Sequence, residues 1–180
     1  MLVSDMSTKL IFITGGARSG KSRFAQKLAD GMKGRKVFIA TAQPLDEEMR
    51  GRIEKHKKER PTGWETVEEP QHLCSAIKKC DGKYNVILID CLTIWISNLL
   101  TQYHSNEKEI LAEVNKLVVS CANIKSTVLI VTNEVGFGIV PADSLSRLFR
   151  DIAGFANQII ASQADEAYLV TAGLPLNLKA

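Results

Sequence analysis

The stretch that decides the fold is Gly15-Gly16-Ala17-Arg18-Ser19-Gly20-Lys21-Ser22, which directly follows the apolar run from Leu10 to Thr14. It matches the pattern GxxxxGK[ST] at every fixed position. Glycines in such a loop let the backbone turn tightly, so that several N–H groups converge on phosphate oxygens. A helix starting near Lys21 would add the positive end of its dipole. The stretch therefore predicts a phosphate-binding loop, or P-loop, between a strand and a helix.

The polar residues around this loop have expected tasks. Lys21 would reach the β- and γ-phosphates of a nucleotide, and the Ser22 hydroxyl would bind Mg²⁺. Asp90 closes a second apolar run, Val86 to Ile89, where P-loop proteins usually carry an acid that holds the metal. Asp90 could also cap the helix that follows, and the two roles are compatible.

Short apolar runs alternate with longer segments of helical spacing along the rest of the chain. Continuous runs predict strands buried on both faces of a parallel sheet, and the alternation predicts an α/β fold with right-handed crossovers. The expected strands are Leu10–Thr14, Lys36–Ala40, Tyr84–Ile89, Thr127–Thr132 and Ala167–Thr171. The expected helices are Lys21–Met32, Asp46–Arg60, Gln71–Cys80, Leu92–Tyr103, Glu107–Ala122 and Ser144–Ala164. Pro61 to Pro70 is expected to be irregular, because Pro, Gly and mixed charge interrupt both periodicities.

Length and composition favour one catalytic domain. The chain has 180 residues, of which 45% are apolar and 24% charged, as in ordinary globular proteins. We expect a ragged N-terminal extension over residues 1–8, with Met6 as an alternative start, and a single domain over residues 9–180. The net charge of +3 is too small to indicate nucleic acid or a membrane surface. No run is long enough for a signal peptide or a membrane span, which predicts the cytoplasm.

The four cysteines are expected to be reduced thiols that pack as small apolar residues, rather than a disulfide or a zinc site. They are far apart in the sequence and lack the spacing of metal ligands: Cys74, Cys80, Cys91 and Cys121.

A strongly basic segment, EEMRGRIEKHKKER, runs from Glu47 to Arg60. Met49, Ile53 and His56 fall at i, i+4 and i+7, and Arg60 at i+11, so they share one stripe of the expected helix. One interpretation is a solvated basic helix with a half-buried histidine. The other is a nucleophile, since neutral imidazole can attack phosphorus and neighbouring cations would lower its pKa and stabilise a departing pyrophosphate. The residues alone leave both open.

A second strand-end acid follows the run Val128 to Thr132, in Asn133-Glu134-Val135-Gly136. Glu134 could act as a base or orient a substrate hydroxyl, and it could equally anchor a turn. The segment is not the NKxD motif with which regulatory GTPases read guanine.

The chain as a whole resembles the bifunctional adenosylcobinamide kinase / adenosylcobinamide-phosphate guanylyltransferase family. The resemblance covers residues 9 to 178 and rests on ITGGARSGKS, IATAQPLDEEMRGRIEKHKKERP, LIDCLTIWISNLL, VTNEVGFGIVP, LFRDIAGFANQIIA and DEAYLVTAGLP. It implies a RecA-like P-loop fold and two steps of cobalamin assembly. ATP or GTP first phosphorylates the hydroxyl of adenosylcobinamide. GTP then forms a GMP–histidine intermediate, from which GMP passes to the phosphorylated cobinamide to give adenosylcobinamide-GDP.

The resemblance also assigns roles to residues. The family's histidine lies in an RI-x-x-H-[KR] pattern, which Arg52 to Lys57 match, so the nucleophile falls on His56. Besides the P-loop, the implied nucleotide contacts are Ala40, Thr41, Ala42, Lys57, Lys58, Glu59, Arg60, Glu68 and Asp90. Some members carry Glu at the position of Asp90, which shifts the carboxylate by one methylene. The resemblance further implies adenosylcobinamide as partner substrate and a homotrimer.

Two other functions remain compatible with a P-loop. One is a small-molecule kinase without guanylyl transfer, in which His56 is structural or contacts phosphate. The other, of a different class, is a nucleotide-dependent switch or RecA-like motor; the short chain and the absence of an aromatic-rich basic loop weigh against a motor, which would act on nucleic acid.

Overall fold

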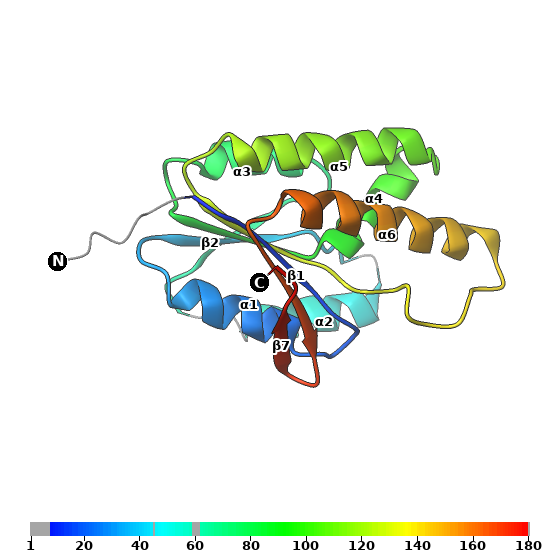
Figure 1. Cartoon of the computed structure of the whole chain (residues 1–180), viewed down its shortest axis with the longest axis horizontal. Coiled ribbons are helices and arrows are strands. Elements are labelled where there is room, and N and C mark those ends of the chain that lie inside the picture. Colours follow the sequence, from blue (N-terminus) through cyan, green and yellow to red (C-terminus); the bar gives the residue numbers. More distant parts are fainter. Residues whose placement is uncertain (1–7, 45, 59–61, 180) are drawn as a thin grey trace.

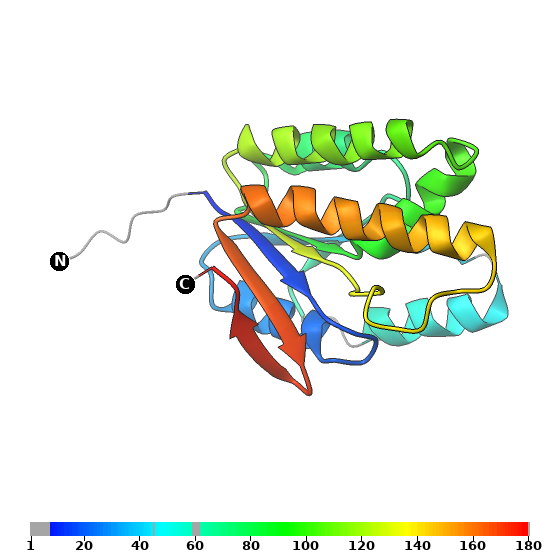
Figure 2. The same ribbon diagram turned by 45° about the vertical axis from the view of Figure 1, so that its right-hand side comes forward.

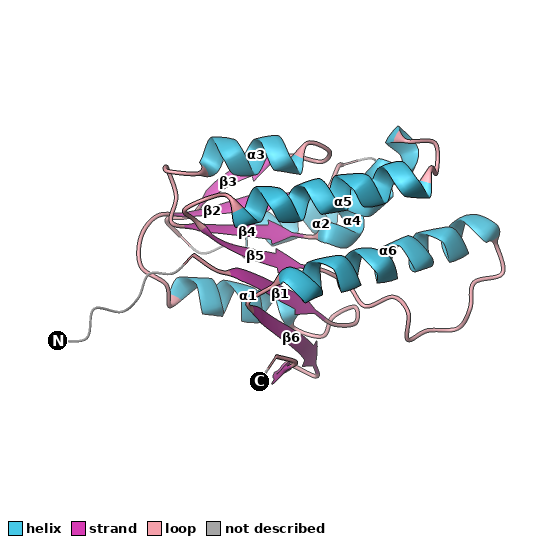
Figure 3. Cartoon of the chain, turned by 45° about the horizontal axis from the view of Figure 1, so that its top comes forward, coloured by secondary structure: helices cyan, strands magenta, loops and turns pink. Residues whose placement is uncertain are grey.

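A mostly parallel sheet forms the middle layer of the chain in the computed structural model, which describes residues 8–44, 46–58 and 62–179 (Figure 1). Its strands in those residues are β1 (Leu10–Thr14), β2 (Lys36–Ala40), β3 (Glu65–Glu68), β4 (Val86–Asp90), β5 (Thr127–Val131), β6 (Glu166–Thr171) and β7 (Leu174–Asn177). They lie in the order β3-β2-β4-β5-β1-β6-β7, and Figure 3 shows this order from β3 to β6. Strand β7 pairs with β6 in the antiparallel direction. The predicted α/β fold with a mostly parallel sheet is confirmed.

Helices cover both faces of this sheet. The helices of the described residues are α1 (Lys21–Asp30), α2 (Glu47–Lys58), α3 (Leu73–Cys80), α4 (Leu92–Gln102), α5 (Glu107–Ala122) and α6 (Ser144–Gln163). Figure 1 shows α1 and α2 below the sheet and the other helices above it, and the turned view of Figure 2 agrees. The fold is therefore a three-layer sandwich, in which the P-loop helix and the basic helix lie on the same side.

Two apolar cores result, one on each face of the sheet. Alternation along β1 sends Leu10 and Phe12 toward the side of α3 to α6, and Ile11 and Ile13 toward α1. Every residue of β1 is buried, which explains why its sequence is a continuous apolar run rather than an alternating one.

The order of the strands creates the crevice in which a ligand can bind. After β1, the chain crosses over β5 and β4 to form β2, whereas β6 lies on the opposite side of β1. Ligands of open α/β sheets bind where such connections diverge, outside the carboxyl ends of the strands. Here the carboxyl ends of β4, β5 and β1 lie side by side at that point.

Two strands were not expected from the sequence, and both lie at an edge of the sheet. The prediction that Pro61 to Pro70 is irregular is wrong for Glu65–Glu68, which pairs with β2 as β3. Because β3 is largely exposed, its sequence ETVE lacks an apolar run. The side chains of Arg35 and Tyr84 each hydrogen-bond to Glu65 at 2.6 Å and hold the strand in place. The other unexpected strand, β7, is exposed throughout.

The remaining boundaries lie within one or two residues of those expected, where the structure describes them. Residues 1–7 of the expected extension, and Glu59, Arg60 and Pro61, lie outside the described residues. The four cysteines carry free thiols. Among the described helices, none combines the length and apolar character needed to cross a membrane.

Candidate active site

The P-loop leaves β1 and turns sharply into α1. Arg18 and Gly20 adopt positive φ angles of 58° and 93°, and the Ser19 N–H donates to the Gly16 carbonyl at 3.2 Å. Helix α1 begins at Lys21 behind Gly20, and its first i→i+4 bond joins Phe24 N–H to Gly20 O at 2.9 Å. The N–H groups of the first turn lack intrahelical acceptors, so they are suited to bind an anion.

Close backbone packing fixes the base of the loop. A Cβ atom on Gly15 would lie 2.3 Å from the Val170 carbonyl oxygen, which leaves no room for a side chain. The N–H of Gly173, in the turn between β6 and β7, donates to the Ser19 carbonyl at 2.8 Å. The C-terminal hairpin therefore supports the phosphate loop from below, a role that its sequence did not suggest.

Lys21 carries a buried positive charge at the end of the loop. It is only 8% exposed, and its Nζ donates to the Gly16 carbonyl at 3.2 Å. Burial lowers the pKa of Lys21, whereas the negative charge of Asp90 works in the opposite direction. Lys21, at the start of α1, and Asp90, at the end of β4, are therefore electrostatically coupled at the carboxyl ends of β1 and β4.

A cavity of about 940 Å³ opens above these residues. It is lined by the P-loop and α1, by the ends of β2, β3, β4 and β5, and by α2. The lining residues are Arg18, Ser19, Gly20, Lys21, Ser22, Arg23, Gln26, Phe38, Ala40, Ala42, Pro44, Met49, Arg50, Ile53, Glu54, Lys57, Glu68, Asp90, Cys91, Ile94 and Asn133. Most of the expected nucleotide contacts thus lie around one cavity of a size suited to a nucleotide.

Four of the expected residues that do not line the cavity lie next to it in the chain. Gly15, Gly16 and Ala17 form the start of the loop, and Thr41 lies buried behind the cavity. The Thr41 hydroxyl donates to the Cys91 carbonyl at 2.8 Å and accepts the Cys91 N–H at 2.9 Å. This pair joins the chain after β2 to the chain after β4, so it fixes the backbone next to Asp90.

Asp90 ends β4 and lines the cavity, and the N-cap position of α4 belongs to Cys91 rather than to Asp90. The helix-cap interpretation of Asp90 is therefore wrong. Burial raises the pKa of the Cys91 thiol to about 12, so Cys91 stays neutral. The oxygen donors of Ser22 and Asp90 line the same cavity, and carboxylate and hydroxyl oxygens are the ligands that Mg²⁺ prefers.

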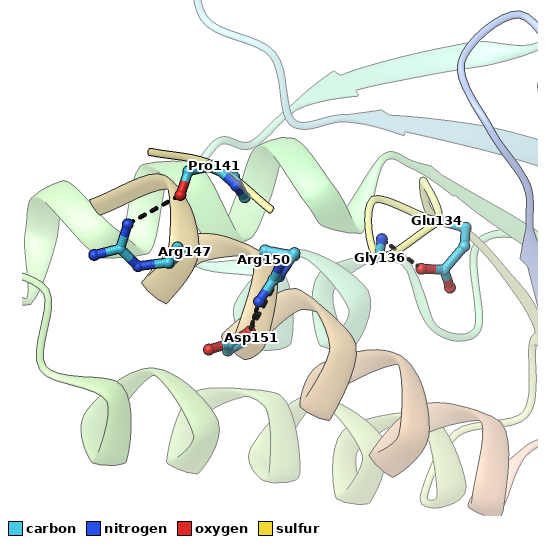
Figure 4. A network of polar contacts seen from close by, with 6 residues as sticks. All are labelled: Glu134, Gly136, Pro141, Arg147, Arg150 and Asp151. Atoms are coloured by element: carbon cyan, nitrogen blue, oxygen red, sulfur yellow. Dashed lines mark hydrogen bonds and ion pairs between the residues drawn. The ribbon is translucent and has the colours of Figure 1, made fainter. Parts of the chain in front are cut away.

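Glu134 is not among the residues that line this cavity. Its carboxylate accepts the Gly136 N–H at 2.7 Å, as Figure 4 shows, and its own N–H donates to the Gly15 carbonyl at 3.0 Å. Arg147 closes the same loop further on by donating to the Pro141 carbonyl at 2.9 Å. The contacts of Glu134 are those of a turn anchor, and a catalytic role stays a prediction.

Helix α2 lines the same cavity as the P-loop. Met49 and Ile53, half-buried, line the cavity, and position 56 belongs to the same helical stripe. Lys57 Nζ lies 2.5 Å from Glu68 Oε1, which ties the end of α2 to the end of β3. The side chains of His56 and Lys58, and all of Glu59 and Arg60, lie outside the described residues. The structure thus places the helix of the expected nucleophile on the cavity.

Sequence reasoning missed Asn133, which lines the cavity directly after β5. Its position was the available signal, because it follows a buried strand at the same end of the sheet as Asp90 and the P-loop.

The fold and the loop define a P-loop nucleotide-binding protein with a RecA-like sheet. Among solved structures, the chain is similar to the assembled type III secretion ATPase EscN of enteropathogenic E. coli (TM-score 0.62, 13% identity, 92% of this chain and 43% of that chain). It is also similar to the RadB recombinase (TM-score 0.51, 10% identity, 89% of this chain and 73% of that chain). The chain spans less than half the length of EscN, and at this identity the likeness shows the fold alone.

Sequence relatives place the chain more narrowly. It belongs to the cobinamide kinase / cobinamide phosphate guanyltransferase family, whose pattern matches residues 11–178. It is 43% identical to the bifunctional adenosylcobalamin biosynthesis protein CobU of Escherichia coli (strain K12), over 94% of this chain and 99% of that protein. It is 40% identical to the bifunctional adenosylcobalamin biosynthesis protein CobP of Pseudomonas aeruginosa, over 93% of this chain and 95% of that protein.

Proposed function

We propose that this chain phosphorylates adenosylcobinamide with ATP or GTP and then transfers GMP from GTP to the product, giving adenosylcobinamide-GDP. The observation that carries the proposal is that a single cavity is lined both by the P-loop and by α2, the helix on which His56 lies. Membership in the family supports both activities. Because both reactions start from a nucleoside triphosphate, one phosphate cradle can serve both.

In the kinase step, the chain acts by binding and positioning. Lys21 and the N–H groups of the first turn of α1 hold the phosphates and stabilise charge that develops on them. The cobinamide hydroxyl oxygen attacks the γ-phosphorus, and the bond from that phosphorus to the oxygen it shares with the β-phosphate breaks. The nucleoside diphosphate leaves with the electrons of that bond, and the hydroxyl proton passes to solvent water. Ser22 and Asp90 would hold Mg²⁺, which neutralises phosphate charge when bound.

In the guanylyl step, the His56 imidazole attacks the α-phosphorus of GTP. An N–P bond forms, and pyrophosphate leaves with the electrons of the broken P–O bond. A phosphate oxygen of phosphorylated cobinamide then attacks the same phosphorus and displaces the imidazole. Arg50 and Lys57, which line the cavity from α2, supply positive charge near the leaving pyrophosphate.

Two features of the proposal rest on resemblance and substrate chemistry. We assign a homotrimeric state, as implied by the resemblance to the family. We also assign the cytoplasm, because the proposed reactions consume ATP and GTP.

The test is to incubate the protein with adenosylcobinamide, ATP, GTP and Mg²⁺ and to follow the corrinoid by chromatography and mass spectrometry. The expected products are adenosylcobinamide phosphate and then adenosylcobinamide-GDP. A phosphorylated corrinoid that never acquires GMP would favour a kinase alone. Nucleotide hydrolysis that does not depend on the corrinoid would favour a switch or motor and overturn the proposal.

A further inference from the structure

Asn133 occupies the central position at the carboxyl end of the sheet. Strand β5 lies between β4 and β1, and Val131 pairs with Asp90 on one side and with Ile13 on the other. The chain stays beside β1 past the end of β5, because the Thr132 N–H donates to the Ile13 carbonyl at 2.9 Å. Asn133 therefore lies between the strand that ends in Asp90 and the strand that leads into the P-loop.

The carboxamide of Asn133 faces the ligand side of the sheet. The Thr132 hydroxyl donates to Asn157 Oδ1, on α6, at 3.0 Å, which places Thr132 on the face covered by α6. Alternation along an extended chain then directs Asn133 toward the opposite face, that of α1, in agreement with its place in the lining of the cavity. Within the described part of the chain, no hydrogen-bond partner of this carboxamide is seen.

A buried ring of hydrogen bonds fixes the backbone of Asn133. Its N–H donates to Thr93 Oγ1 at 2.7 Å, and Thr93 Oγ1 lies 3.1 Å from Thr132 Oγ1. Because the Thr132 proton goes to Asn157, the Thr93 hydroxyl donates to Thr132. Asn157 Nδ2 reaches back to the Asn133 carbonyl at 3.5 Å, and Thr93, Thr132 and Asn157 are all buried. Both backbone groups of Asn133 are thus held by side chains from α4 and α6.

We propose that the Asn133 carboxamide donates a hydrogen bond to the terminal phosphate of the bound nucleoside triphosphate, and that Thr93 and Asn157 are its positioning residues. The inference rests on the proposed nucleotide site. The groups beside Asn133 are Lys21 and Asp90, which bind the outer phosphates and the metal, rather than groups near a base or ribose. A rigidly held neutral donor at this place favours binding of a nucleoside triphosphate over a diphosphate. Its hydrogen bond to the terminal phosphate becomes stronger as charge develops during phosphoryl transfer.

Binding of a triphosphate and a diphosphate tests this contact directly. In Asn133→Ala, we expect the affinity for guanylyl imidodiphosphate with Mg²⁺ to fall about 10-fold or more, as for a lost hydrogen bond to a charged group. The affinity for GDP should stay within about twofold, because GDP lacks the contacted phosphate. Asn115→Ala, at an exposed site on α5, is the matched control and should change neither affinity. Asn133→Asp keeps the shape of the side chain and should also lower the affinity for the triphosphate selectively, because the carboxylate repels the terminal phosphate.

Variants of Thr93 test the ring of hydrogen bonds that fixes the backbone of Asn133. Thr93→Val removes the hydroxyl that accepts the Asn133 N–H but keeps the size of the side chain. It should lower kcat of phosphoryl transfer about 10-fold with GDP affinity unchanged, and Thr93→Ser should restore the rate. If Thr93→Val does not fold, the selective loss in the Asn133 variants still decides the inference.

If Asn133→Ala lowered the affinity for both nucleotides equally, or lowered neither affinity, the inference would be overturned. Failure of the proposed function is a separate result: the wild-type protein would then not modify adenosylcobinamide, whereas the selective effect on triphosphate binding would persist.

Discussion

The P-loop with α1 and the basic helix α2 line one cavity, but they are packed into the fold differently. Lys21, Ala25 and Ala29 of α1 are buried, and Gly15 is wedged against the backbone of β6. In α2, no residue whose burial is described is buried, and the ion pair Lys57–Glu68 that ties it to β3 is largely exposed. The phosphate cradle is thus fixed by the core, whereas α2 is held by a half-buried stripe and a surface contact.

This difference separates two tasks. Stabilising phosphate charge requires preorganised donors, which close backbone packing provides before any ligand binds. Presenting a nucleophile to the α-phosphate requires only that the side chain can reach the cavity. Substitutions at the packed positions of the P-loop and α1 should therefore affect both folding and both reactions, and substitutions in α2 should affect the guanylyl step with little effect on stability.

The largest expected effect is that of Lys21→Ala. Removing the buried cation should lower both phosphoryl and guanylyl transfer about 10²–10³-fold, because both steps use the same cradle. Turnover of each step is measured separately with purified corrinoid substrates. Lys27→Ala, on the exposed face of α1, is the control and should keep both rates. Intact guanylyl transfer in Lys21→Ala would disprove a shared site.

Gly15→Ala tests whether the P-loop is fixed by packing. The new Cβ would lie 2.3 Å from a backbone oxygen that cannot move aside, so we expect a loss of about 2–3 kcal/mol in the free energy of unfolding. Gly16→Ala, where a Cβ meets nothing within 4 Å, should change stability by less than about 0.5 kcal/mol. Urea denaturation of the two variants measures the difference, and equal stabilities would contradict the account.

Asp90→Asn should have a smaller effect, which appears in how the kinase rate depends on Mg²⁺ concentration and on pH. We expect the Mg²⁺ concentration for half-maximal kinase rate to rise about 10-fold, because a charged ligand becomes neutral. The Asp90 charge opposes the lowering of the Lys21 pKa by burial, so its removal lowers that pKa further. Lys21 then loses its proton at lower pH, and the alkaline limb of kcat/KM should shift to lower pH. An unchanged magnesium titration would remove Asp90 from the metal site.

The smallest expected effect is that of Gly51→Ala in α2. Gly51 is exposed and a Cβ there meets nothing within 4 Å, so alanine should stabilise the helix by about 0.5–1 kcal/mol. Both transfer rates should stay near the wild-type values. A destabilised protein would show that α2 is packed as tightly as the P-loop, and the contrast between the two regions would be lost.

The sequence predicted those parts of the molecule that combine burial with a local motif. β1 and the P-loop were predictable because a continuous apolar run precedes a glycine pattern with one known use. Strand β3 was not, since an exposed edge strand such as ETVE has no apolar periodicity and depends on Arg35 and Tyr84, which are distant in the sequence.

The site likewise combines residues with a local sequence signal and contacts that form only in the folded chain. Lys21, Ser22 and Asp90 could be predicted because each stands at a defined place in a motif or at a strand end. Asn133 also stands at a strand end, but the contacts with Thr93 and Asn157 that hold its backbone could not be predicted, because only the folded chain brings these residues together. The support of the P-loop by Gly173 is likewise a tertiary contact without a local signal.

The central claim is that the P-loop and the α2 nucleophile share one cavity, and the most direct measurement is mass spectrometry after incubation with GTP and Mg²⁺ in the absence of corrinoid. We predict an acid-labile GMP adduct on the peptide that contains His56. The adduct should be absent from His56→Ala, which should retain kinase turnover, and present in His72→Gln, a control at an exposed histidine. A protein that binds GTP but forms no adduct, or an adduct on another residue, would contradict the account.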